Sequence, residues 1–287
     1  MMKRKKYSRS DKIFRAALFI VMLLFSISYI LLLVWMIFGS MRSVSNFNKH
    51  PFNLFDITLG SIKKNYNRAF TYKAYGTTAM PTMIRNSAIY VAGTVFLAVL
   101  FPNITGYIVA KYRFRLNGFI TNLAIVTMVI PTIGSVTTTY RFLDSLKLLN
   151  TFYGVFLMSA GGFGFGFLLF RNFYEAIPWE YAESAFLDGA SNWKVFVKIM
   201  APQARPIIVS IAIVTFISCW NDYYTPYIYL NDFPTVAYGL NAIYSKYSSS
   251  MPYVFAAMTF TTGVVLIVFC AFSKMIMNSM SAGGLKG

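Results

Sequence analysis

Long runs without a charged residue constrain the fold more than any other feature of this sequence. No Asp, Glu, Lys or Arg occurs from residue 16 to 40, and about 20 apolar residues are enough to cross the hydrocarbon core of a bilayer. Five similar runs follow, at 87–110, 116–140, 151–170, 207–230 (interrupted only by Asp222) and 253–272. Backbone polar groups in lipid must be hydrogen-bonded within the protein, and the ten-residue alternation of a barrel is absent. We therefore expect an all-α membrane protein with six transmembrane helices.

The composition agrees with this expectation. The chain is 57% hydrophobic and only 12% charged, which is too apolar for a water-soluble domain. We expect a basic N-terminal segment (1–15), one transmembrane domain (16–277) and a C-terminal tail (278–287). The net charge of +17 does not predict nucleic acid as a partner, because most cations flank the apolar runs.

The distribution of the cations predicts an orientation. With the N-terminus inside, sixteen of the 26 Lys and Arg residues fall on the cytoplasmic side, as the positive-inside rule requires. Both termini are then cytoplasmic, and the long segment 41–85 is external, with short helices and irregular structure. The first run is about twice as long as a signal-peptide core, so we expect an uncleaved helix.

Several chemistries are excluded by the residues available. His50 is the only histidine, and both cysteines lie in apolar runs, so we predict no metal site and no disulfide. No Gly-x-x-x-x-Gly-Lys-Ser/Thr motif occurs, so this chain does not bind ATP in a phosphate loop. The glycine-rich stretch 161–166 lacks the lysine of such a loop. Gly162 and Gly166, four residues apart, instead predict close helix packing. We expect no enzymatic activity.

The segment 171–205 has the pattern of two short helices. Pro178 suits the first position of the first helix, and Gly189 is expected to end it. Ser191 can cap the second helix, which we expect to run to a break at Pro202.

This segment also carries a spaced motif: Glu183-Ser184-Ala185, then Gly189, Ile199 and Pro202. It resembles the cytoplasmic signature loop of permeases of ATP-binding-cassette (ABC) importers, with Ser184 in place of an alanine and Ala201 in place of a leucine. The resemblance implies a type I ABC importer permease fold. It also implies that the 178–202 loop couples the permease to separate ATPase subunits, which carry the ATP and Mg²⁺.

The residues implied in coupling are Glu183, Ser184, Ala185, Asp188, Gly189, Ala190, Ile199 and Pro202. Small residues, including Ala182, would let the helix approach a partner closely, and Glu183 and Asp188 could accept hydrogen bonds from its cations. The alternative is a solvated amphipathic connector.

Further stretches resemble the sugar permeases of the maltose-transporter type, and in particular their second permease subunit. They are Ile130-Pro131, Leu149-Asn150-Thr151, Phe170-Arg171-Asn172-Phe173, Ile177-Pro178, Asp188-Gly189-Ala190, Trp220-Asn221-Asp222-Tyr223 and the tail 281–287. The resemblance implies a multi-pass protein of the bacterial plasma (inner) membrane. Its partners would be a second permease subunit in a heterodimer, two ABC ATPase subunits, an extracellular solute-binding protein, membrane lipid and a sugar or oligosaccharide. The tail would reach toward the ATPase pair.

Polar residues inside the 207–230 run predict where a substrate passes. Asn221 and Asp222 are polar at membrane depth, and Trp220, Tyr223 and Tyr224 could stack on sugar rings. The alternative is that Asp222 binds water near the external end and that the aromatic residues are interfacial anchors.

Two further hypotheses follow from the charges. An ion-gradient-driven secondary transporter is the alternative function, but six helices would be few and Asp222 alone is thin support. The predicted external side has ten cations and four acids, which suggests an acidic cargo or an acidic binding protein. The alternative is that these cations are lipid-facing residues whose charged ends reach the membrane surface.

Overall fold

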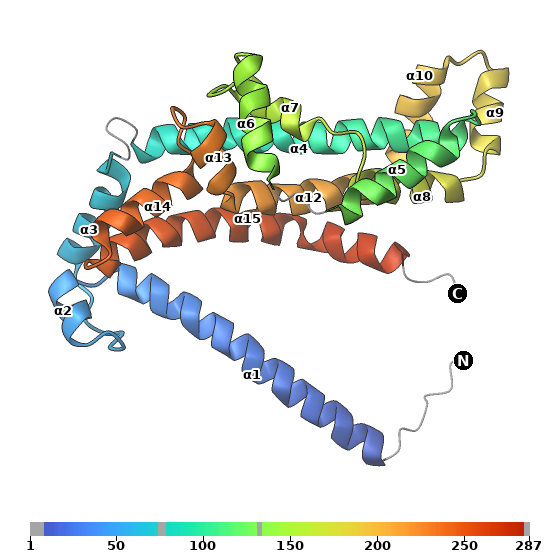
Figure 1. Ribbon diagram of the computed structural model, residues 1–287. Helices are drawn as coiled ribbons and strands as arrows, with labels where there is room; N and C mark the ends of the chain where they lie inside the picture. Colours follow the sequence, from blue (N-terminus) through green and yellow to red (C-terminus); the bar gives the residue numbers. More distant parts are fainter. Residues whose placement is uncertain (1–8, 74–78, 131–133, 284–287) are drawn as a thin grey trace. The chain divides into compact units, whose positions relative to one another are not determined.

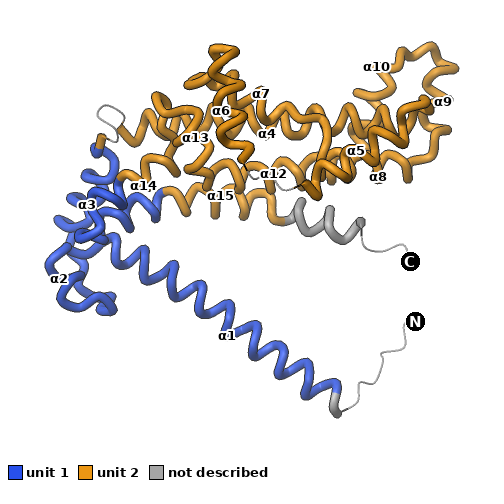
Figure 2. Tube along the Cα trace, viewed as in Figure 1, with its two compact units in different colours: residues 1–72, 243–260 blue, residues 73–242, 261–287 orange. Residues whose placement is uncertain are grey.

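The computed structural model in Figure 1 describes residues 9–73, 79–130 and 134–283. Within these ranges the regular elements are helices, apart from one isolated antiparallel bridge between Arg42 and Ile57. The chain divides into two compact units, drawn in different colours in Figure 2. Unit 1 comprises residues 1–72 and 243–260, and unit 2 comprises residues 73–242 and 261–287. The all-helical prediction is thus confirmed for the described residues.

Unit 1 contains three helices of the N-terminal region: α1 (Arg9–Ser40), α2 (Val44–Lys49) and α3 (Leu59–Thr71). The short helices expected in the 41–85 segment are therefore present. Asn65 of α3 donates its amide to the carbonyl oxygens of Ser40 and Arg42, at 2.8 and 2.7 Å. Arg42 is fully buried and donates to the backbone oxygens of Asn46 and His50. These bonds fix the chain directly after α1.

Unit 2 contains the remaining elements and parts of the last two helices. They are α4 (Met80–Lys111), α5 (Asn117–Val129), α6 (Ser135–Ser145), α7 (Phe152–Ser159), α8 (Phe165–Ala176), α9 (Glu180–Leu187), α10 (Asn192–Val195), η1 (Phe196–Met200), α11 (Ala201–Gln203), α12 (Arg205–Asn221), α13 (Tyr224–Tyr229), α14 (Val236–Tyr247) and α15 (Met251–Gly283). The helix α4 is central, because α7, α8 and α12 all pack against it.

Three helices among the described residues are long and apolar enough to cross a membrane. They are Asp11–Ser40, Met80–Lys111 and Met251–Ser273, and they match the first, second and sixth predicted spans. A fourth candidate is the bent pair Asn192–Gln203 and Arg205–Asn221. Six spans and the placement of the termini stay predictions.

The other three apolar runs are each divided into two helices, which the sequence analysis did not predict. The 116–140 run holds α5 and α6, and α5 ends one residue before Ile130, which precedes a proline and is extended as such residues prefer. The 151–170 run holds α7 and α8, separated by glycines, with Gly164 at a φ of +130°. The 207–230 run holds α12 and α13.

The glycine pair predicted for helix packing has a different setting. Gly162 lies in the break between α7 and α8, and only Gly166 is helical. Close approach to α4 is nevertheless present, since a β-carbon on Gly162 would lie 2.9 Å from Thr105 Cγ2. The Thr105 hydroxyl donates to the carbonyl oxygen of Gly162 at 2.5 Å. The predicted close packing is present at Gly162, although this glycine lies outside a helix.

Candidate functional site: a helix–turn–helix after α8

The segment 171–205 forms the predicted pair of short helices. The first, α9, carries Glu180 and Glu183 in its first turn and ends with Asp188 as its C-cap. Gly189 has a φ of +76°, a conformation that glycine adopts without steric cost. The amide of Gly189 bonds Phe186 O at 3.0 Å and that of Ala190 bonds Ala185 O at 2.9 Å, which is a Schellman C-cap. The predicted stop at Gly189 is confirmed.

The second helix begins as predicted but ends later. Ser191 is its N-cap, and its hydroxyl accepts from the amide of Lys194 at 3.4 Å. The helix passes from α10 through the π-helix η1 into α11, so the predicted break at Pro202 is wrong. The amide of Ala201 bonds Phe196 O with π spacing, and Pro202 then occupies the first turn of α11, where a missing amide hydrogen is tolerated. The break lies at Ala204, where the axis bends by 73° into α12.

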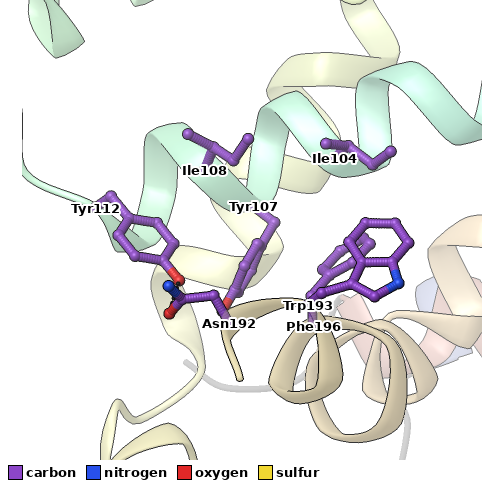
Figure 3. Close-up of a pocket in the computed structure, with 7 residues that line it drawn as sticks. All are labelled: Ile104, Tyr107, Ile108, Tyr112, Asn192, Trp193 and Phe196. Carbon is purple, nitrogen blue, oxygen red and sulfur yellow. Dashed lines mark hydrogen bonds between the residues drawn. The ribbon is translucent and has the colours of Figure 1, made fainter. Parts of the chain in front are cut away.

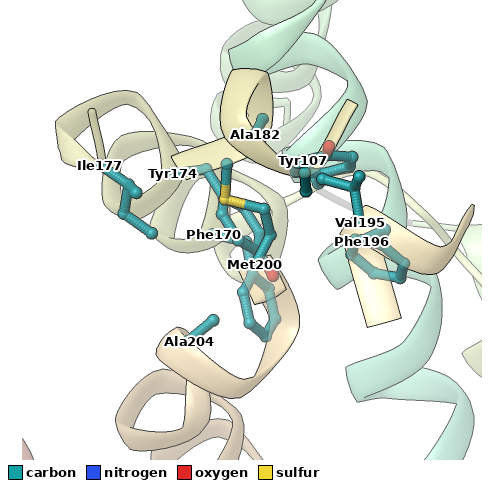
Figure 4. Close-up of a cluster of buried hydrophobic side chains, with 10 residues drawn as sticks. Tyr107, Phe170, Tyr174, Ile177, Ala182, Val195, Phe196, Met200 and Ala204 are labelled. Carbon is teal, nitrogen blue, oxygen red and sulfur yellow. The ribbon is translucent and has the colours of Figure 1, made fainter. Parts of the chain in front are cut away.

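An aromatic cluster holds this helix–turn–helix against α4 and α8, as Figure 4 shows. Ten buried residues form it: Tyr107, Phe170, Tyr174, Ile177, Ala182, Ala185, Val195, Phe196, Met200 and Ala204. The Tyr107 ring lies 5.3 Å from that of Tyr174 and 4.9 Å from that of Phe196, between centroids. The loop is therefore a packed part of unit 2, which argues against a freely solvated connector.

Three hydrogen bonds accompany this packing. The Tyr174 hydroxyl donates to Asn103 Oδ1 at 2.5 Å, and the Tyr112 hydroxyl to Asn192 Oδ1 at 3.0 Å. The Lys111 ammonium group donates to the carbonyl oxygen of Ile177. Each bond joins the C-terminal half of α4, or the residue after it, to α8 or to the loop. The loop is therefore joined to α4 by hydrogen bonds as well as by packing.

The residues predicted for coupling divide into an inner and an outer set. Ala185 is 9% exposed and Ala182 fully buried in the cluster, so these two small residues pack within this chain. Ala190 and Ile199 are half-buried at its margin. The outer set is exposed: Glu183, Ser184, Asp188, Gly189 and Pro202.

Sequence reasoning missed the most exposed apolar side chain of this loop. Leu187 is 89% exposed and follows Glu180, Glu183 and Ser184 at helical spacings of seven, four and three. We call the surface formed by these four residues the outer face of α9. The spacing alone would have shown that Leu187 shares a face with the motif's acid.

A shallow pocket of about 330 Å³ lies beside the second helix. Figure 3 shows its lining: Ile104, Tyr107, Ile108, Tyr112, Asn192, Trp193 and Phe196. Its lining is mostly apolar and aromatic, and no carboxylate, imidazole, thiol or amine contributes to it, so it suits an apolar group. Among the described residues, no cluster of three or more His, Cys, Asp or Glu side chains could hold a metal ion.

The residues predicted for a substrate path surround the break between α12 and α13. Asp222 Oδ1 accepts from the amides of Tyr224 and Thr225 at 2.9 and 3.0 Å, and Oδ2 accepts from the Tyr90 hydroxyl at 3.0 Å. Asp222 is the C-cap residue of α12 and precedes Tyr223, the N-cap residue of α13. Its carboxylate caps the first two amides of α13 at the break in the 207–230 run.

The neighbours of Asp222 have different settings. Trp220 is 8% exposed, and its indole donates to Thr261 O at 3.3 Å. Asn221 is exposed and donates back to Ile217 O at 2.8 Å. Tyr223 and Tyr224 are about half exposed. Of the five predicted residues, Asn221, Tyr223 and Tyr224 are therefore the ones accessible to a ligand.

Comparison with known proteins places the chain in a family. Residues 102–281, more than half of the chain, match the family described as the binding-protein-dependent transport system inner membrane component. The chain belongs to this family. It is therefore a membrane permease component of an ABC importer, as the signature loop implied.

Individual relatives extend the similarity over nearly the whole chain. The diacetylchitobiose uptake system permease protein NgcG of Streptomyces coelicolor is 28% identical, over 96% of this chain and 90% of its own length. The arabinooligosaccharides transport system permease protein AraQ of Bacillus subtilis is 24% identical, over 98% and 99%. A solved bacterial ABC transporter involved in the import of the acidic polysaccharide alginate shares the fold, with a TM-score of 0.77 at 22% identity over 94% of this chain and 99% of the other.

Proposed function

We propose that this chain is one of two permease subunits of an ATP-driven importer of oligosaccharides, and that it corresponds to the second permease subunit of maltose-type transporters. A binding protein would deliver the cargo, a second permease subunit would complete the path, and two ABC ATPase subunits would hydrolyse ATP. The support for the cargo class is that relatives aligning over almost the full length carry diacetylchitobiose and arabinooligosaccharides in their names.

The observation that carries the coupling proposal is the two-sided build of α9. Its inner face is fixed in the aromatic cluster through Ala182 and Ala185, and its outer face presents Glu183, Ser184 and Leu187. An exposed leucine between carboxylates suits a groove with an apolar floor and cationic rims. A displacement of α9 by a partner bound to its outer face would be transmitted to α4 through Tyr107 and to α8 through Tyr174.

We further propose that both termini are cytoplasmic and that six segments cross the membrane, some of them as broken helices. This arrangement puts α9 on the side where ATP is hydrolysed. It also places ten cations and four acids on the outer side, which supports an acidic cargo or binding protein. Equal uptake of neutral and acidic oligosaccharides at low salt would remove the charge hypothesis.

The test is ATP hydrolysis by the complete complex reconstituted with its binding protein and candidate oligosaccharides, compared with a Leu187→Asp complex, which changes the exposed leucine of the outer face. We expect one oligosaccharide to stimulate hydrolysis, and we expect the variant to lose that stimulation or to lose the ATPase subunits. Stimulation that is unchanged in the variant would contradict coupling through this loop. Absence of any co-purifying ATPase would favour the ion-gradient alternative.

A further inference from the structure

Three large apolar side chains of unit 1 are almost fully exposed on one short connection. Phe52, Phe55 and Leu59 are 84, 91 and 86% exposed. Phe52 and Phe55 lie between α2 and α3, and Leu59 is the first residue of α3; residues 50–59 are called the 50–59 turn. Side chains of this size rarely protrude together into water, so they indicate an interaction surface.

The position of this turn along α1 is fixed by two contacts to one tryptophan. The Trp35 indole donates to the carbonyl oxygen of Pro51 at 2.9 Å, and the Trp35 ring stacks on that of Phe52 with centroids 6.1 Å apart. Trp35 precedes Ser40, the last residue of α1, by five residues, or about 7 Å of helix. The turn therefore folds back beside the last turns of α1 instead of extending beyond them.

Hydrogen bonds keep the turn in this position. The Arg42 guanidinium donates to His50 O at 2.9 Å and to Asn46 O at 3.0 Å, and it lies 5.6 Å from the Phe47 ring centroid. Asn53 Oδ1 accepts from the amide of Phe55 at 3.0 Å. The exposed side chains are thus presented by an ordered segment.

The neighbouring surface of α1 identifies the partner. The Asp11–Ser40 helix is long and apolar enough to cross a membrane, and none of its most apolar window is buried within the described chain. The exposed part of this helix covers residues 11–32, and the turn lies at the other end, where residues 33–38 are partly buried and Gly39 and Ser40 are buried. Beside Phe52 there is also a shallow hollow of about 490 Å³, lined by Lys49, His50, Pro51, Phe52 and Asn53. A cation at the rim of apolar side chains matches a lipid with its phosphate above its acyl chains.

We propose that the 50–59 turn is an interfacial membrane anchor, whose Phe52, Phe55 and Leu59 enter the lipid at the C-terminal end of α1. Lys49 and His50 then face the phosphate level of the same leaflet. The anchor fixes the depth of α1 and holds α3, which is bonded to the end of α1 through Asn65.

The test measures depth in the complete complex in lipid nanodiscs. In a background with Cys219→Ser and Cys270→Ser, a small environment-sensitive fluorophore is attached at Phe55→Cys. Leu59→Cys is a second position, and both side chains are exposed enough to be replaced without loss of packing. Lys64→Cys is the control, because Lys64 is an exposed cation outside the turn, next to Asn65, which bonds the last residue of α1.

We expect lipids brominated in the upper acyl chain to quench the probes at 55 and 59 several-fold more than the probe at 64. Aqueous iodide should quench in the reverse order. Iodide quenching as strong at 55 and 59 as at 64 would overturn the proposal. Protection of 55 and 59 from both quenchers would also overturn it, since the turn would then be covered by protein. The readout needs neither cargo nor ATP, so its outcome is independent of the proposed transport function.

Discussion

At the scale of single residues, Asp222 shows how a polar group in an apolar run can be structural. The sequence suggested a carboxylate on the substrate path, whereas the structure uses both of its oxygens to join α12, α13 and α4. Position and chemical type were predictable from the sequence. The hydrogen bond from the Tyr90 hydroxyl was not, because Tyr90 is 132 residues away in the chain.

Replacement of Asp222 tests the structural role. Asp222→Ala removes the cap of α13 and the acceptor of the Tyr90 hydroxyl, and we expect it to lower the free energy of unfolding by about 1–2 kcal/mol. Thermal or denaturant unfolding in detergent measures this. Asn221→Ala, which removes one bond of an exposed side chain, is the control and should change stability little. A change in cargo affinity with unchanged stability would favour direct sugar contact instead.

Gly189 is a second residue-scale determinant, through its backbone. A β-carbon there would meet nothing within 4 Å, so any cost comes from the φ of +76°. We expect Gly189→Val to cost about 1–2 kcal/mol locally and to reduce cargo-stimulated ATP hydrolysis, whereas Gly189→Asn should keep most of it, since Asn tolerates this region. Equal hydrolysis by both variants would show that the left-handed turn does not matter for coupling.

At the scale of elements, the sequence predicted the loop better than the membrane segments. Local signals, Gly189 and Ser191, set the ends of α9 and α10, and they act on neighbouring residues only. The end of the second helix was missed because the π-helix carries it past Pro202. The breaks in three apolar runs were missed because hydrophobicity measures length in lipid and not the continuity of a helix.

The outer face of α9 makes an element-scale prediction. Leu187 is 89% exposed and contributes little to the chain's own packing, so Leu187→Asp should leave the unfolding temperature of the permease unchanged. We expect the same variant to weaken co-purification of the ATPase subunits at least tenfold, as loss of a buried apolar anchor does. Leu187→Met is the matched control and should retain binding. Full association of the Asp variant would place the ATPase contact elsewhere.

At the scale of the whole molecule, the family resemblance predicted more about function than local sequence patterns did, and the charge distribution predicted an orientation in the membrane. The family was identifiable from the spacing around Glu183, Gly189 and Pro202, and the match over residues 102–281 confirms it. The burial of single side chains could not be predicted in the same way. Ala182 and Ala185 are small, as a close contact with a partner requires, but they are buried within this chain in the cluster that includes Tyr107 and Tyr174.

Orientation in the membrane is a prediction that belongs to this scale. Single cysteines at Lys12, Lys64 and Arg113, in a background without Cys219 and Cys270, would be labelled with a membrane-impermeant maleimide. In intact cells from which any outer membrane has been removed, we expect Lys64→Cys to react and the other two to react only after lysis. Labelling of the cysteine at position 12 before lysis would show the opposite orientation.

ATP-driven uptake of a labelled oligosaccharide into proteoliposomes tests the central claim most directly. The liposomes contain the complete complex, with binding protein outside and ATP trapped inside, and wild type is compared with Leu187→Asp. We expect uptake that requires both ATP and binding protein and that the variant loses. Uptake that proceeds without ATP, follows an imposed ion gradient and persists in the variant would contradict the central claim.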